Sequence, residues 1–166
     1  MILGDLAPYT LAANRSDWGE LLTEWQPILP ANAKLWILSC FGELFFEHSN
    51  GKIGMLQVSA FRYEVVAKDK KDFEEWLVDP DKMSEWFLAP LVDRLVVSGK
   101  TLKPDSCYSF ITPLGLGGQI EEKNVSMLPV SDHFGCWGEI FRQVKDVPDG
   151  GHVIIRPERK SPTNPR

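Results

Sequence analysis

Residues 44–58, with the sequence LFFEHSNGKIGMLQV, decide the fold of this chain. Two apolar runs flank the tripeptide Ser49-Asn50-Gly51. An Asn-Gly pair between two such runs predicts a β-hairpin, because a type I′ turn requires positive φ at both of its central residues. We therefore expect strands over residues 44–48 and 52–58, joined by this turn.

Two further apolar runs extend the hairpin into a meander. Residues 35–40 precede it and residues 62–67 follow it, and both runs are rich in residues typical of strands. We expect residues 1–15 to be extended. Four apolar residues at helical spacing, Trp18, Leu21, Leu22 and Trp25, predict a first helix. We expect Asn14 or Ser16 to cap it, and Pro27 and Pro30 to end it.

The middle of the chain has a helical pattern. Asp69 or the neighbouring lysines can begin a helix that ends before Pro80, and Asp81 can cap the next one. Pro90 cannot lie inside a regular helix, so we expect a restart there and a stop at Gly99. The buried faces of these helices should hold Phe73, Trp76, Leu77, Met83, Trp86, Phe87, Leu91, Val92, Leu95 and Val96.

Strand patterns return near the C-terminus. Residues 107–112 and 124–130 flank a glycine-rich loop at residues 113–118, and a last amphipathic helix precedes an expected edge strand at residues 152–155. Strands and helices come in blocks rather than in strict alternation. The predicted fold class is therefore α+β, a mostly antiparallel sheet with amphipathic helices packed on one face, in a single domain.

Composition and charge narrow the function. The chain has 166 residues, of which 43% are hydrophobic, and this excludes disorder throughout. The net charge is −5; residues 156–166 carry +3, so residues 1–155 carry −8. We expect one domain over residues 1–155 and a disordered, basic, proline-rich tail over residues 156–166. An acidic body disfavours direct nucleic-acid binding and attracts basic partners.

No apolar run is long enough to cross a bilayer, and the N-terminus lacks the pattern of a secretory signal. We therefore expect a cytoplasmic protein with no membrane partner. The three cysteines, Cys40, Cys107 and Cys136, show no CxxC spacing. An odd number of thiols in the cytoplasm predicts free cysteines, and their apolar surroundings predict that most are buried.

Catalytic and cofactor sites find little support in the sequence. The loop Gly115–Gly118 lacks the Walker and dinucleotide-binding spacings, and two glutamates that would repel a phosphate follow it. Cys107 and His133 could form a nucleophile and base, but Cys107 lies in an apolar strand, where a thiol is normally protonated. His133 and Cys136 provide only two metal ligands. We expect no enzymatic activity, no cofactor and no metal.

For the remaining candidate side chains, the carboxylate pairs and the tryptophans, a structural role is the simplest interpretation. The carboxylate pairs Glu74-Glu75, Asp79-Asp81 and Glu121-Glu122 are expected on solvated surfaces, where a carboxyl group does not gain the raised pKa that a general acid needs. The tryptophans fall on apolar helix faces or on a predicted strand, so we expect them in the core.

Three segments, taken in order, resemble the C-terminal domain of the type VI secretion immunity proteins that protect bacteria from a secreted DNase. Residues 41–45 (FGELF) resemble the start of that family's hairpin. Residues 107–118 (CYSFITPLGLGG) are similar to its pattern CYGFxPPLxLGG, and residues 138–150 (GEIFRQVKDVPDG) to GQIHxQIxDLPDG. The helical stretch 73–95 fits the family's two-helix insert. Phe141 stands where the family commonly has His.

The resemblance, which covers residues 16–150, implies a non-enzymatic protein that binds and neutralises a secreted bacterial toxin, with a basic nuclease as the candidate. Acidic positions near the hairpin and the glycine loop would attract such a partner. The predicted partner-binding residues, expected to be exposed on one side of the fold, are Glu43, Glu47, Glu121 and Glu122.

Two alternatives remain open. The chain could be a small ligand-binding domain or an enzyme that uses the cleft around Gly115–Gly118. It could also be a scaffold domain with a housekeeping partner.

Overall fold

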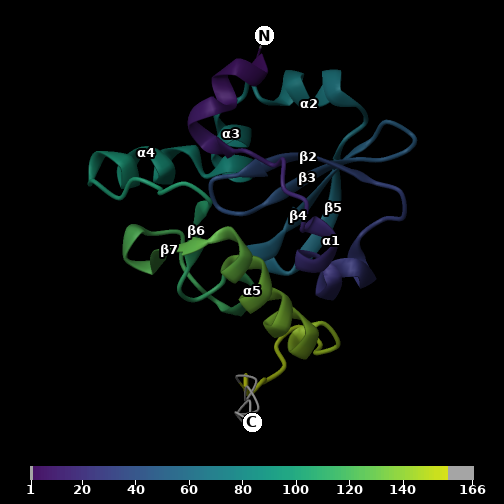
Figure 1. Ribbon diagram of the computed structural model, residues 1–166, viewed down its shortest axis with the longest axis vertical. Helices are drawn as coiled ribbons and strands as arrows, with labels where there is room; N and C mark the ends of the chain where they lie inside the picture. The colour runs from purple at the N-terminus through teal and green to yellow at the C-terminus, as the bar shows by residue number, and fades with distance from the viewer. Residues whose placement is uncertain (1, 157–166) are drawn as a thin grey trace, which may run out of the picture.

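The computed structural model describes residues 2–156, and side chains from residue 4 onward (Figure 1). Its centre is a five-stranded antiparallel meander in which each strand pairs with the next along the chain. This confirms the predicted meander. The strands are β1 (Thr10–Leu11), β2 (Lys34–Ser39), β3 (Leu44–Glu47), β4 (Ile53–Gln57) and β5 (Arg62–Ala67).

The central hairpin is confirmed, but its turn differs from the predicted one. Gly51 has a positive φ of +86°, whereas Asn50 is not among the residues with positive φ. The Gly51 N–H donates to the His48 carbonyl at 2.9 Å, and the His48 N–H donates to the Lys52 carbonyl at 2.8 Å. This is a three-residue loop with one left-handed glycine. The type I′ prediction is wrong because this loop needs positive φ only once.

The N-terminal region is more helical than expected. Residues Ile2–Tyr9 form a 3₁₀ helix (η1), so the expectation of an extended lead-in is wrong. The predicted first helix consists of one α-helical turn, α1 (Trp18–Leu21), followed by a 3₁₀ helix, η2 (Thr23–Ile28), which includes Pro27. Asp17 holds the N-cap position of α1, in place of Asn14 or Ser16.

Three helices follow β5, and side-chain caps set two of their starts. In α2 (Lys70–Trp76), the Asp69 carboxylate accepts a hydrogen bond from the Asp72 N–H, as predicted. In α3 (Pro80–Phe87) the cap is Asp79 rather than Asp81, and Pro80 occupies the first turn, where its missing N–H costs nothing. The predicted restart at Pro90 is α4 (Ala89–Val97), which ends at a left-handed Gly99.

The C-terminal part adds a second sheet and the longest α-helix of the described chain. β6 (Ser106–Phe110) pairs antiparallel with β7 (Val125–Pro129), and α5 (Val130–Val144) follows directly. Two 3₁₀ helices, η4 (Leu114–Leu116) and η5 (Glu122–Asn124), lie in the connection between these strands, and η3 (Val58–Ala60) joins β4 to β5. Residues 152–155 form no strand, which corrects that expectation. All but the first residue of the predicted tail lies outside the described residues.

Helices cover both faces of the large sheet, rather than one face as predicted. Figure 1 shows α2 and α3 on one side and α1 and α5 on the other. Neighbouring residues of each strand point to opposite sides, so Leu44 packs in the α5 cluster and Phe45 in the α2–α3 cluster. Residues 44–46 and 53–56 are apolar without alternation, which is the pattern of a sheet buried on both faces.

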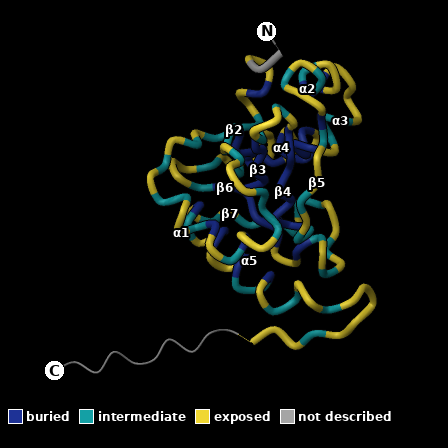
Figure 2. The backbone as a smooth tube through the Cα atoms, turned by 90° about the vertical axis from the view of Figure 1, so that its right-hand side faces the viewer, coloured by how far each residue is buried: buried dark blue, intermediate teal, exposed yellow. Residues whose placement is uncertain are grey.

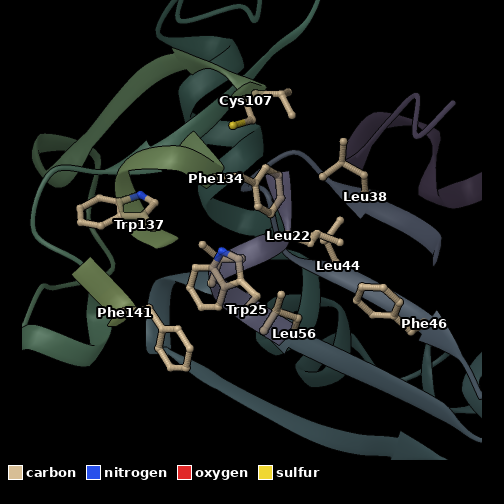
Figure 3. Packing of buried hydrophobic residues seen from close by; sticks show 12 residues of the cluster. Leu22, Trp25, Leu38, Leu44, Phe46, Leu56, Cys107, Phe134, Trp137 and Phe141 are labelled. Atoms are coloured by element: carbon tan, nitrogen blue, oxygen red, sulfur yellow. The ribbon is translucent and has the colours of Figure 1, made fainter. Parts of the chain in front are cut away.

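The α5 side of the core is organised around stacked aromatic rings (Figure 3). The rings of Trp25 and Phe141 lie 4.7 Å apart and are nearly parallel, at 8°. Trp18 meets Phe134 edge-to-face at 5.3 Å. Figure 2 shows these buried segments at the centre, with exposed loops around them. Trp25 and Phe141 thus fasten η2 to α5, which holds the N-terminal segment on the sheet.

Candidate partner-binding surface

Glu43 does not lie on the surface, which corrects the expectation that it is exposed. Its exposed fraction is 4%. The carboxylate accepts hydrogen bonds from the Val58 N–H and from the Ser59 hydroxyl, and a longer one of 3.4 Å from the Ser59 N–H. Burial raises the pKa of Glu43 to about 7, because desolvation outweighs these stabilising donors. Glu43 therefore holds the turn between β4 and β5 from inside.

The other three predicted glutamates are half-exposed, and each is already in an ion pair. The carboxylate of Glu47 lies 2.8 Å from the Lys70 ammonium of α2. Glu122 pairs with Arg94 of α4 at 3.4 Å, and Glu121 pairs with Lys123 at 3.3 Å. Glu47 therefore contacts α2, whereas Glu122 contacts α4. No described interaction joins Glu47 to the other two.

The glycine-rich loop has a steric reason for its composition. A Cβ built on Gly118 would lie 1.9 Å from the Thr112 carbonyl oxygen, and one built on Gly115 would lie 2.5 Å from the Phe61 ring. Gly117 has a positive φ of +87°. The two close approaches and the one positive φ explain why glycine occupies these three positions, and no phosphate ligand is needed to explain them. Gly115 also borders a cavity of about 510 Å³ beside α3, which the loop closes on one side.

Cys107 and His133 are not arranged as a nucleophile and base. Nδ1 of His133 lies 3.0 Å from the Ser109 hydroxyl oxygen, which also accepts a hydrogen bond of 2.9 Å from Nε1 of Trp137. Burial lowers the pKa of His133 to about 4 and raises the pKa of Cys107 to about 12. These polar groups belong to the interior between β6 and α5.

Three further observations concern the cysteines, the possible metal ligands and membrane-spanning helices. All three cysteines are free, as predicted, but Cys136 is exposed whereas Cys40 and Cys107 are buried. Among the described residues, no group of three or more His, Cys, Asp or Glu side chains is placed to hold a metal ion. Within the same residues, no helix is long and apolar enough to span a bilayer.

A surface that the sequence reasoning missed lies where α2 meets α3. We call it the α2–α3 corner, residues 72–85. It carries six carboxylates against the one ammonium of Lys82, a net charge of −5. Trp76, expected in the core, is 45% exposed, and Val78 is 71% exposed. The signal was visible as a run of acidic residues around a tryptophan, but each acidic pair was interpreted separately.

The corner is a continuous surface because Lys82 bridges its two helices. The Lys82 ammonium lies 5.6 Å from the centre of the Trp76 ring and 5.5 Å from the centre of the Trp86 ring. It also donates to the Glu85 carboxylate at 2.7 Å. Tryptophan is enriched at protein–protein interfaces, and the exposed Trp76 ring lies beside Lys82 in a segment with net negative charge.

The fold and this corner thus describe an α+β protein with a surface suited to binding another protein. Residues 67–140 match the family model described as T6SS immunity protein Tdi1, C-terminal. This segment begins at the end of β5, includes the α2–α3 corner and the glycine loop, and ends within α5. Over residues 67–140, which include the segment 107–118, the match confirms the resemblance to type VI secretion immunity proteins and supports a toxin-neutralising role; residues 41–45 and 141–150 lie outside the match. No curated protein matches the chain.

Proposed function

We propose that this protein is a non-enzymatic immunity protein that binds a secreted bacterial nuclease and neutralises it. The observation that carries the proposal is the match of residues 67–140 to an immunity-protein family. The charge of the chain favours a nuclease among toxins, because nucleases present basic surfaces to their substrate. A body with a charge of −8 over residues 1–155 would speed the encounter with such a surface.

Within this proposal, the α2–α3 corner is the surface that first contacts the toxin. Trp76 provides the large, partly exposed ring that binding hot spots favour, and Val78 lies close to it in sequence. Glu74 and Glu75 provide charge without a capping role, unlike Asp79, which caps α3, and Glu75 lies 3.7 Å from the exposed Lys71 ammonium. Glu47, Glu121 and Glu122 remain candidates for the periphery of the interface, where electrostatic attraction affects mainly the association rate.

The test is co-expression with the product of a neighbouring gene that encodes a secreted toxin. We expect growth protection, loss of DNA degradation, and a complex that survives gel filtration. Trp76→Ala should speed dissociation. Reversal of charge by Glu74→Lys with Glu75→Lys should slow association and reduce its dependence on ionic strength.

The matched control makes the same charge change elsewhere, with Glu20→Lys and Asp146→Lys, two exposed carboxylates outside the corner. A slower association with the corner pair alone supports the assignment, and equal slowing with both pairs would place the contact elsewhere. Reversing Glu121 and Glu122 together tests the glycine-loop side in the same way. Thermal-shift screening with nucleotides and metabolites addresses the ligand-binding alternative, in which a ligand would raise the melting temperature.

A further inference from the structure

A cavity of about 510 Å³ opens between the β4–β5 end of the sheet, α3 and the glycine loop. Its walls are mixed. Apolar side chains come from Met55, Trp86, Leu88, Leu114 and Ile120. The polar side chains are Glu43, which precedes β3, Gln57, Ser59 and Arg62 at the β4–β5 end, and Asp81, Ser84 and Glu85 of α3. This combination of apolar walls and a few polar groups is typical of a site that receives a ligand.

The charge of the lining is negative. Glu43, Asp81 and Glu85 supply carboxyl groups, and Arg62 is the only cationic side chain among the described residues that line the cavity. Arg62 is already engaged, because its Nε donates to the Gln57 side chain and its guanidinium lies 3.5 Å from Glu64. The cavity therefore disfavours an anionic ligand and favours a cationic one.

The chain already binds a cation of its own at this cavity's edge. Lys82 is held by the Glu85 carboxylate and by the ring of Trp86, and both of these residues also line the cavity. A carboxylate combined with an aromatic face is a favourable environment for an ammonium or guanidinium group. This observation is independent of the charge count, and it shows which chemistry these two side chains support.

We propose that the cavity receives the side chain of an arginine residue of the toxin. The apolar walls fit the methylene stem of arginine, and the carboxylates match its planar, five-donor head group. For the source of that side chain, the inference rests on the proposed function. The pKa of Glu43, raised to about 7, provides an accompanying signature: a cation nearby favours the ionised carboxylate, so binding near pH 7 should release protons.

The test uses the full chain and the tripeptide acetyl-Gly-Arg-Gly-amide, with the citrulline tripeptide as a neutral control of the same shape. Binding is followed by protein NMR and by calorimetry in buffers of different ionisation enthalpy. We expect the arginine peptide to bind with proton release and the citrulline peptide to bind about tenfold more weakly or not at all.

Three variants place the site. Glu85→Gln should weaken binding of the arginine peptide, Ser84→Trp should block the cavity, and Lys82→Gln should tighten binding because it removes the competing ammonium. Asp146→Asn is the control, since Asp146 is exposed and lies outside both the cavity lining and the α2–α3 corner. A variant is interpreted only if the NMR resonances of residues outside the cavity match those of the wild-type protein, which shows that it is folded. Equal binding of both peptides, or no effect of Ser84→Trp, would overturn the inference.

The two proposals fail in different ways. Suppose that the protein neutralises its toxin, and that the Ser84→Trp variant still protects and still binds the arginine peptide. The cavity inference is then overturned and the proposed function stands. If the arginine peptide binds through Glu85 but the protein protects against no toxin, the cation chemistry of the cavity is supported and the proposed function is overturned.

Discussion

Nδ1 of His133 lies 3.0 Å from the hydroxyl oxygen of Ser109, in the closed interior between α5 and β6. The hydroxyl oxygen also accepts from Trp137, so its proton is available to the imidazole nitrogen. On the other side of the ring, Nε2 lies against Gly42, where even a Cβ would come within 2.2 Å. The imidazole is therefore enclosed on both sides, and burial keeps it neutral, with its pKa lowered to about 4.

This buried histidine should make the fold sensitive to acid. The unfolded chain binds a proton near pH 6.5, whereas the folded chain does not until about pH 4, so the free energy of unfolding falls as pH drops between these values. His133→Gln should remove this contribution, so that stability falls as pH rises from about 4.5 to 7, which is the dependence that Glu43 alone leaves. Urea unfolding at several pH values measures it, and an unchanged slope in the variant would contradict the assignment.

Glu43 should act in the opposite sense. Its folded pKa of about 7 lies above the ordinary 4.5, so its contribution to stability is full below pH 4.5 and is lost as pH rises through 7. Between pH 4.5 and 6.5 the two groups oppose each other, and the wild-type protein should show a shallow profile. Glu43→Gln should then reveal the histidine slope, with stability rising as pH rises. The same series of urea titrations checks this, and a flat profile for Glu43→Gln would count against it.

Phe141 should be a stability residue rather than a functional one. Its ring stacks on Trp25 at 4.7 Å and is 2% exposed. Phe141→Ala should lower the free energy of unfolding by about 3–5 kcal/mol, the usual cost of emptying an aromatic core position. Val97→Ala, at a position that is 89% exposed, is the control and should change it by less than about 0.5 kcal/mol. Equal effects of the two variants would mean that the stack contributes little.

Two glycine-to-alanine changes should have opposite effects. At Gly118 the added Cβ would meet the Thr112 carbonyl oxygen at 1.9 Å, so the loop must shift and the protein must lose stability. Gly135 lies on α5 with no described atom within 4 Å of the added Cβ, so alanine there should stabilise the helix by roughly 0.5–1 kcal/mol. Melting temperatures of the two variants provide the comparison, which fails if Gly118→Ala is neutral.

The cysteines should divide into one accessible and two protected thiols. Cys136 is exposed, whereas burial raises the pKa of Cys40 to about 11 and of Cys107 to about 12. A thiol reagent at pH 8 should label Cys136 in the folded protein and all three after denaturation. Mass spectrometry identifies the labelled sites, and labelling of Cys107 in the folded state would show that β6 opens readily.

Local sequence patterns predicted the secondary structure correctly where the conformation depends on residues that are adjacent in the chain. The hairpin around Asn50-Gly51, the Asp69 cap, the restart at Pro90 and the stop at Gly99 depend on the conformations of a few adjacent residues. The first helix was predicted less well. The apolar spacing from Trp18 to Trp25 is helical, but η2 tightens around Pro27 and stacks Trp25 on Phe141, a partner that the local sequence does not contain.

The sequence by itself determined the meander, the α+β class and the acidic charge, because strand pairing between neighbours and net charge follow from residues close together or from composition alone. Tertiary structure decided which side chains the solvent reaches. Glu43 is drawn inside because the backbone of the β4–β5 turn provides donors for its carboxylate, whereas Trp76 is left outside because Phe73 and Leu77 already occupy the inner face of α2. Burial depends on which segments pack together from far along the chain, and no single stretch of sequence contains that information.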